Sequence, residues 1–244
     1  MSEDPSGWQQ SAQAWIAHLG DAGDRGRQYI LDAPMRAAAR DSGAKNALDV
    51  GCGEGRFCRM LREDGITATG LDPTPALLEA ARSRDPEGTY IEGRGEELPF
   101  PDQTFDLVVS YLSLIDIPDY QAAIAEMARV LTKGGTLLVG NLNSFVTAVP
   151  RNWPNDTGGW VTAGKTRLFH AMDDYMDERG TRVAWAGIEI LNYHRPLSHY
   201  MAAFLGAGLS LVHYDEPPYT GPDEDVAAKM HRCPWFNMMI WRKI

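Results

Sequence analysis

The segment Ala47–Arg56 constrains the fold of this chain more than any other, and it reads ALDVGCGEGR. Four mostly apolar residues lead directly into three closely spaced glycines, a pattern typical of a buried strand that turns into a helix. Gly51, Gly53 and Gly55 lack a Cβ atom, so the backbone can adopt left-handed dihedral angles and a ligand can lie against it. The segment therefore predicts a strand, a ligand-binding turn and a helix.

Predicted strands and helices alternate from this segment as far as residue 143. Strands are expected at residues 47–50, 66–71, 89–92, 106–110 and 136–140, and helices at 56–63, 75–81 and 120–131. Two helices at 8–19 and 29–40 precede them, and a helix at 198–207 with strands at 209–214 and 235–242 closes the chain. This alternation implies right-handed crossovers and a doubly wound α/β fold.

The regular alternation stops between residues 144 and 196. Aromatic residues are denser here than the chain average of 9%, and prolines and glycines interrupt the segment. Thr181–Tyr193, with Gly187 midway, predicts an antiparallel hairpin. The aromatic side chains either line a site for a planar or apolar small molecule or form a small separate core. They include Trp153, Trp160, Phe169, Tyr175, Trp185 and Tyr193.

Length and pattern together predict three segments. The 244 residues are enough for one large domain and too few for two of that size. We expect an N-terminal helical lid at residues 1–43 and a ligand-binding sheet domain at residues 44–143 and 197–244. Residues 144–196 are expected to form a substrate-binding cap beyond the carboxyl edge of the sheet.

Charge and cysteine content narrow the function classes. The net charge of −10 disfavours a broad phosphate-binding surface and hence a nucleic-acid substrate. Cys52, Cys58 and Cys233 have no metal-ligand spacing, so no metal site is predicted, and they are typical of free thiols in a reducing cytoplasm. Residues 1–10 carry no export signal and no apolar run is long enough to span a membrane, so a soluble, cytoplasmic protein is expected.

In its glycine turn the chain resembles the class I S-adenosylmethionine-dependent methyltransferases of the small-molecule, type 11-like kind, whose first motif has the form of residues 48–55. The resemblance implies a Rossmann-like, mostly parallel seven-stranded sheet with an antiparallel C-terminal strand pair and a cap inserted after the fifth strand. It implies S-adenosylmethionine as the cofactor and S-adenosylhomocysteine as the product.

The resemblance also implies where the cofactor is held. Asp72 ends the second predicted strand, where a carboxylate can accept hydrogen bonds from both ribose hydroxyls. Many relatives have Asp-Ala where this chain has Arg94-Gly95, so only backbone groups of Gly95 and Glu96 are assigned to the adenine. Backbone carbonyls after the fourth strand are expected to receive the methionine amine. The predicted cofactor-binding residues are Arg27, Tyr29, Asp49, Gly51, Cys52, Gly53, Asp72, Pro73, Gly95, Glu96, Ser110, Tyr111 and Leu112.

The chemistry asks little of catalytic side chains. Methyl transfer from a sulfonium is a direct displacement, so the enzyme chiefly aligns the reactants and excludes water. An acceptor hydroxyl or amine would benefit from one base, whereas a carboxylate acceptor would need none. His194 and His199 flank the start of the last large helix and are the predicted catalytic candidates, with structural roles as the alternative.

Other functions share parts of this pattern. A nicotinamide-dependent oxidoreductase needs G-x-G-x-x-G, but here the third glycine comes one residue early and Arg56 stands where that glycine belongs. Glu54 in the turn would also oppose a pyrophosphate. A protein that binds the cofactor without turnover, as a sensor or an interaction partner, is the main alternative. An RNA methyltransferase is less favoured, and the oligomeric state is not predicted.

Overall fold

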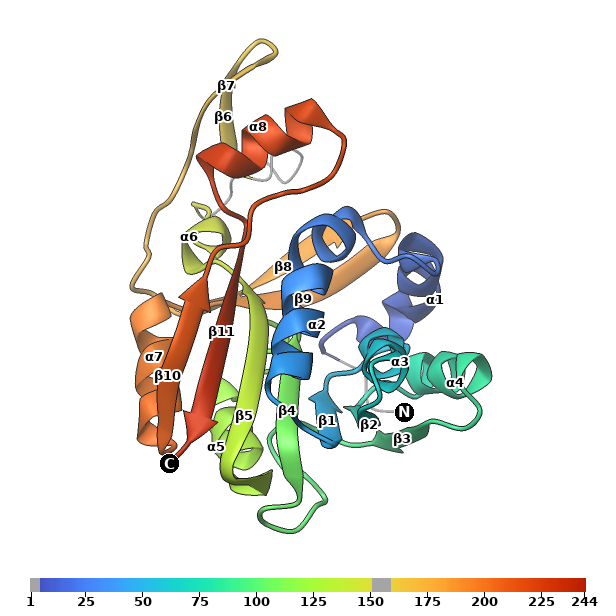
Figure 1. Cartoon of the computed structure of the whole chain (residues 1–244). Helices are drawn as coiled ribbons and strands as arrows, with labels where there is room; N and C mark the ends of the chain where they lie inside the picture. Colours follow the sequence, from blue (N-terminus) through green and yellow to red (C-terminus); the bar gives the residue numbers. More distant parts are fainter. Residues whose placement is uncertain (1–4, 151–158) are drawn as a thin grey trace.

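The computed structural model describes residues 5–150 and 159–244, and its centre is a seven-stranded sheet of order β10-β11-β5-β4-β1-β2-β3 (Figure 1). Strands β1 to β5 run parallel, and β11 runs antiparallel to both β5 and β10. This architecture confirms the predicted Rossmann-like fold with its antiparallel C-terminal pair. The bounds are β1 (Asn46–Val50), β2 (Thr67–Asp72), β3 (Thr89–Glu92), β4 (Phe105–Tyr111), β5 (Leu131–Leu142), β10 (Leu209–Asp215) and β11 (Phe236–Lys243).

Helices cover both faces of the sheet. Along β4, Leu107 and Val109 belong to the core on one face and Val108 to the core on the other, as the two-residue period of a strand requires. The first face is covered by α2 (Asp32–Asp41), α3 (Arg56–Glu63) and α4 (Pro75–Arg84), and the second by α5 (Tyr120–Val130) and α7 (Leu197–Gly206). The strands are therefore buried on both sides, which explains their nearly continuous apolar sequences.

The predicted helix at 29–40 consists of two elements. A π-helical turn, η1 (Arg27–Leu31), precedes α2, and the backbone N–H of Asp32 donates to the carbonyl of Arg27, five residues earlier. Pro34 has no N–H to donate to the carbonyl of Ile30, so a regular α-helix cannot continue unbroken across this point. The wider turn brings Arg27 to the carboxyl edge of the sheet.

Several elements lie beyond that edge, at the top of Figure 1. The predicted hairpin is confirmed as β8 (Arg179–Trp185) and β9 (Ile188–His194), and both residues of its turn have positive φ, 47° at Ala186 and 79° at Gly187. The other elements here are α6 (Ser144–Thr147), the hairpin of β6 (Trp160–Ala163) and β7 (Thr166–His170), and α8 (Glu224–Arg232). Trp153, counted among the aromatic residues above, lies outside the described residues.

The N-terminal helix α1 (Trp8–Leu19) packs between β9 and α4. Its apolar side meets Leu77, Ile188 and Ile190, and the Ser11 hydroxyl exchanges hydrogen bonds of 2.9 Å with the backbone of Glu189. Because β9 and α4 are far apart in sequence, this helix joins the inserted hairpin to the sheet domain. None of the helices within residues 5–150 and 159–244 is long and apolar enough to cross a membrane.

Candidate active site

Two adjoining cavities lie at the carboxyl edge of the parallel strands. The first, of about 210 Å³, is enclosed by the glycine turn, the ends of β2 and β4, and α1. The second, of about 1590 Å³, lies between α1, the β8–β9 hairpin, α6 and α8. Five residues line both cavities and so form their junction: Trp8, Trp15, Arg27, Leu112 and Asp116.

The glycine turn packs against protein at Gly51 and faces open space at Gly53. Gly51 has a φ of 78°, and a Cβ atom there would lie 2.4 Å from the Cβ of Ser113, so no larger residue fits. Gly53 has a φ of 54°, but a Cβ atom there would meet no atom within 4 Å. Since Gly53 lines the first cavity, the turn presents bare backbone to whatever the cavity holds.

Asp72 connects the turn to the end of β2. One carboxylate oxygen accepts a hydrogen bond from the N–H of Gly53 and the other from the N–H of Thr74, both at 2.9 Å. Its burial raises the pKa of the carboxyl group, while these two hydrogen bonds lower it. Each carboxylate oxygen can accept more than one hydrogen bond, so Asp72 can fix the turn and still receive two hydroxyls of a ligand.

Asp49, which lines the same cavity, has a buried acceptor without a partner in the described chain. Its side chain is 1% exposed, and among the described residues Oδ1 has no hydrogen-bond partner, whereas Oδ2 accepts the Cys58 thiol at 3.6 Å. Burial raises the pKa of this carboxyl group to about 7, and the Arg27 guanidinium lowers it slightly. A buried oxygen without a partner is costly, so this position fits an incoming donor such as an ammonium group.

Arg27 of η1 also lines the first cavity. Its guanidinium is 4.9 Å from the centre of the Trp15 ring and 5.6 Å from that of Tyr111, and it pairs with Asp24. A guanidinium held between two rings is suited to a carboxylate. With Asp49 as the anion and Arg27 as the cation, the cavity matches the two charges of an amino-acid zwitterion, as the cofactor implied by the sequence requires.

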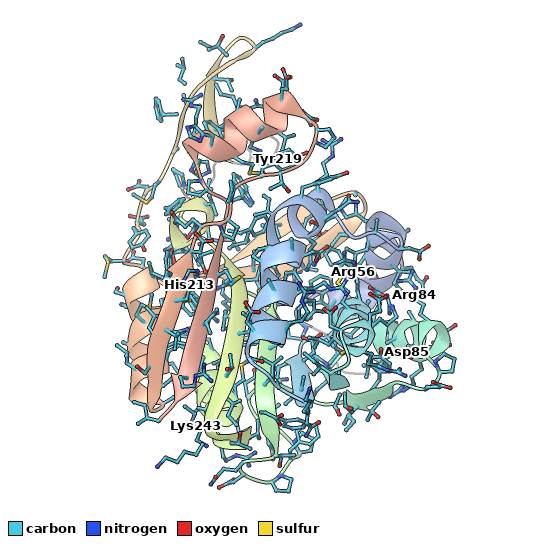
Figure 2. The ribbon with its side chains drawn as sticks, in the orientation of Figure 1. Arg56, Arg84, Asp85, His213, Tyr219 and Lys243 are labelled. Atoms are coloured by element: carbon cyan, nitrogen blue, oxygen red, sulfur yellow. The ribbon has the colours of Figure 1, made fainter. Side chains whose placement is uncertain are left out.

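The charges of the turn itself are internally compensated. Glu54 is 1% exposed and pairs with Arg59 at 2.8 Å and with Arg84, which Figure 2 labels at the end of α4. These two ion pairs weaken the predicted opposition between Glu54 and a pyrophosphate, although Glu54 lines the first cavity. Arg56, also labelled in Figure 2, forms a buried ion pair with Asp32, whose carboxylate also accepts a 2.8 Å hydrogen bond from the Tyr111 hydroxyl.

Most of the predicted cofactor residues line the first cavity. They are Arg27, Asp49, Gly51, Cys52, Gly53, Asp72, Pro73, Gly95, Glu96, Tyr111 and Leu112. Tyr29 and Ser110 line neither cavity. The Tyr29 ring packs 5.6 Å from that of Tyr219, in the connection before α8, and the Ser110 hydroxyl is fully buried against that of Ser113. Tyr29 faces away because the π-turn directs Arg27, two residues earlier, to the site.

The two predicted catalytic histidines are not free bases at the junction. His194 lines the second cavity, but Nε2 bonds the carbonyl of Tyr175 and Nδ1 bonds the hydroxyl of Thr147, both at 2.8 Å. Because a carbonyl only accepts, Nε2 carries the proton, and both ring nitrogens are engaged. Burial lowers the pKa of His194. His199 is exposed, pairs with Glu178 at 2.6 Å and lines neither cavity.

Asp116 is the site residue that the sequence reasoning missed. It lies in the β4–α5 loop, and its carboxyl group accepts hydrogen bonds from the Asn192 amide and the Trp8 side chain. Burial is the main cause that raises the pKa of this carboxyl group to about 7, while the two hydrogen bonds lower it. Its signal in the sequence is its position just after the fourth strand, where only backbone carbonyls were considered.

Among the described residues, no group of three histidine, cysteine or acidic side chains is arranged to hold a metal ion.

Residues 48–139 match a protein family that is described as a methyltransferase domain. The matched residues run from β1 to β5 and thus include the turn and Asp72.

Relatives and solved structures agree with this match. The chain is 42% identical to malonyl-[acyl-carrier protein] O-methyltransferase of Serratia marcescens over 95 residues, 39% of this chain and 37% of that protein. It is 31% identical to methyltransferase GfsG of Streptomyces halstedii over 189 residues, 72% of this chain and 62% of that protein. The chain thus spans less than two thirds of either relative. The structure of an S-adenosylmethionine dependent methyltransferase from Mesorhizobium loti superposes with a TM-score of 0.75 at 24% identity, covering 92% of this chain and all of that one.

Proposed function

We propose that the chain is a class I S-adenosylmethionine-dependent methyltransferase and that it methylates a small organic molecule. The observation that carries the proposal is the first cavity, where bare glycine backbone, a ribose-competent carboxylate and a pair of opposite charges meet. When bound there, S-adenosylmethionine supplies an activated methyl group on its sulfonium.

Each proposed contact uses a side-chain group that can form further hydrogen bonds to a ligand. Asp72 receives the two ribose hydroxyls, the unpartnered Oδ1 of Asp49 receives the methionine ammonium, and Arg27 holds the methionine carboxylate. Backbone groups of Gly95 and Glu96 contact the adenine. Helix α1 covers the cavity and excludes water, which favours transfer to the acceptor over loss of the methyl group to solvent.

The second cavity supports a small, apolar or aromatic acceptor. Aromatic side chains line it from several directions: Trp8 and Trp15 from α1, Trp185 from β8, and Trp235 with Phe236 from the start of β11. We propose that the described parts of the predicted lid and cap, residues 5–43, 144–150 and 159–196, act together as its cover. Helix α8, outside the predicted cap, contributes Lys229 and Met230 to the wall. The acceptor atom is an oxygen or a nitrogen, including a carboxylate oxygen.

The test is calorimetry with S-adenosylhomocysteine on matched glycine variants. Gly53→Ala places a methyl group in the open space of the first cavity, and it should weaken binding at least tenfold. Gly43→Ala is the control, because Gly43 is exposed and also has a positive φ, 70°, and a methyl group there would meet no atom within 4 Å. Both variants should lose about 1 to 2 kcal/mol of folding free energy from the left-handed backbone, so only the ligand distinguishes them.

Asp72 is a less decisive target, because its carboxylate also holds the turn through Gly53. Binding of NADH in place of S-adenosylhomocysteine, or equal affinities of the two alanine variants, would refute the proposed cofactor site. Binding of S-adenosylhomocysteine without methyl transfer to any metabolite in a broad panel would favour the sensor alternative.

A further inference from the structure

The loop between β4 and α5 carries an acidic group to the junction of the two cavities. Asp116 lines both of them, and residues 112–118 of this loop separate the cofactor side from the acceptor side. Asn192 of β9 and Trp8 of α1 both donate hydrogen bonds to its carboxyl group. The carboxyl group is thus fixed from two elements that belong to the cover of the site.

Three titratable groups interact with the carboxyl group of Asp116, and they belong to η1, β2 and α7. Arg27 of η1 favours its ionised form, and Asp72 at the end of β2 opposes it. Asp116 in turn raises the pKa of Tyr200 in α7, although burial is the main cause there. No described cation forms an ion pair with Asp116 within 4.0 Å, so its charge is left available to a ligand.

Arg195 fixes the loop without touching the acceptor. Its buried guanidinium donates to the backbone carbonyls of Leu114 at 2.7 Å, Pro118 at 3.0 Å and also Ile117. Three backbone acceptors on one side chain hold residues 114–118 in a single conformation. Arg195 is therefore a positioning residue for Asp116.

We propose that Asp116 is the catalytic base of the methyl transfer, and that the acceptor atom therefore carries a proton as a hydroxyl or amine N–H. This rests on the proposed function. The acceptor's proton passes to a carboxylate oxygen of Asp116, and its lone pair forms the new bond to the methyl carbon. The carbon–sulfur bond breaks with its electron pair remaining on sulfur, so atoms and charges balance without any redox partner.

The same geometry disfavours a carboxylate acceptor. A second carboxylate placed beside ionised Asp116 would meet like-charge repulsion. A hydroxyl or amine instead donates a hydrogen bond to Asp116 before it reacts. The three acceptor atoms left open by the sequence are thereby reduced to two.

The first test needs no acceptor. In the complex with S-adenosylhomocysteine, carbon-13 NMR of labelled aspartate carboxyl groups, assigned by the signal lost in Asp116→Asn, should show a titration with a midpoint near pH 7. Asn192→Ala should move that midpoint to higher pH, because the amide stabilises the ionised form. A carboxyl group that stays protonated from pH 5 to pH 8 would overturn the inference, because it could not accept the acceptor's proton.

The second test uses labelled S-adenosylmethionine with a panel of phenols and aryl amines and the matching benzoates. Transfer to the phenols and amines should rise with pH through the same midpoint, because the base must be ionised, and Asp116→Asn should lower it at least 100-fold. Asn192→Ala should shift the profile upward in pH, an effect that a merely structural role would not give.

The outcomes separate this inference from the proposed function. If Asp116→Asn still binds S-adenosylhomocysteine within threefold of the native protein but retains methyl transfer within threefold, the inference fails and the methyltransferase proposal stands. Methyl transfer to the benzoates but not to the phenols or amines would likewise refute the inference and leave the methyltransferase proposal standing. If the native protein does not bind S-adenosylhomocysteine, the proposed function itself fails.

Discussion

Asp49 shows how a single buried side chain couples stability to ligand binding. Its carboxyl group has a pKa of about 7 because burial disfavours the charge, and its Oδ1 has no partner in the described chain. The ionised group is therefore a cost to the folded protein. That cost prepares the site for a cationic ligand, because an ammonium at Oδ1 removes it.

Asp49→Asn should stabilise the protein in a pH-dependent way. The pKa in the folded state lies above the ordinary value of 3.8, so ionisation penalises folding only as the pH rises from about 4 to about 7. The variant's gain in unfolding free energy should be absent at pH 4 and reach at most about 4 kcal/mol above pH 7.

Urea unfolding at several pH values measures this difference. The exposed Glu92 at the end of β3 provides the control, and Glu92→Gln should show no such pH-dependent gain. A constant difference across pH for Asp49→Asn would mean that its carboxyl group titrates normally in the folded state.

The identity of the base illustrates what the sequence could and could not reveal at this scale. The glycines and Asp72 were predictable because their spacing within a strand–turn–helix unit fixes their positions. Histidine was favoured for its solution pKa, but His194 is engaged at both ring nitrogens. The pKa of Asp116 is raised by burial among α1, β9 and the β4–α5 loop, which no local pattern reports.

At the scale of the element, the β4–α5 loop depends on one arginine. Arg195 is 2% exposed, lies 4.4 Å from the centre of the Tyr120 ring and 4.7 Å from that of Tyr193, and donates to three carbonyls of the loop. The segment 194–198 therefore stabilises the conformation of the β4–α5 loop and takes no direct part in the proposed methyl transfer.

Arg195→Lys should cost about 2 to 4 kcal/mol of unfolding free energy, because one ammonium cannot reach the acceptors that the planar guanidinium serves and would leave buried carbonyls unpaired. Denaturant unfolding measures the loss. Arg242→Lys, at an exposed position on β11 that also bonds a carbonyl, should change stability by less than about 0.5 kcal/mol. Similar losses in the two variants would show that the loop does not depend on Arg195.

The regular elements were predictable to within a few residues, and α1, α3 and β3 have the predicted bounds. They carry strong periodicity or sharp boundaries such as the glycine turn. Helix α8 was not predicted, since none of its residues is fully buried and its sequence holds few large apolar side chains. The hairpin of β6 and β7 also lacks alternation, because its strands are largely exposed.

At the scale of the whole molecule, the cover of the first cavity is assembled from distant parts of the chain. Helix α1 packs on β9 and α4, and the connection that follows it brings Arg27 to the junction. Ligand in the first cavity contacts Trp15, Leu19 and Arg27, so binding should stabilise this cover relative to its open form.

Limited trypsin digestion followed by mass spectrometry tests this stabilisation. Saturating S-adenosylhomocysteine should slow cleavage after Arg25 at least fivefold, since its side chain is 68% exposed and the residue lies in the connection between α1 and η1. Cleavage after Lys165, in the turn between β6 and β7 and outside both cavity linings, is the control and should keep its rate. Equal protection at both positions would indicate general stabilisation instead.

The sharing of Trp8 and Trp15 between the two cavities has a kinetic consequence. Helix α1 contributes a wall to both cavities. An acceptor bound in the second cavity would therefore hold α1 against the first cavity and block the exit of the methyl donor. Turnover should therefore follow a fixed sequence, in which the methyl donor binds first, the methylated product departs next, and the spent donor is the last molecule released.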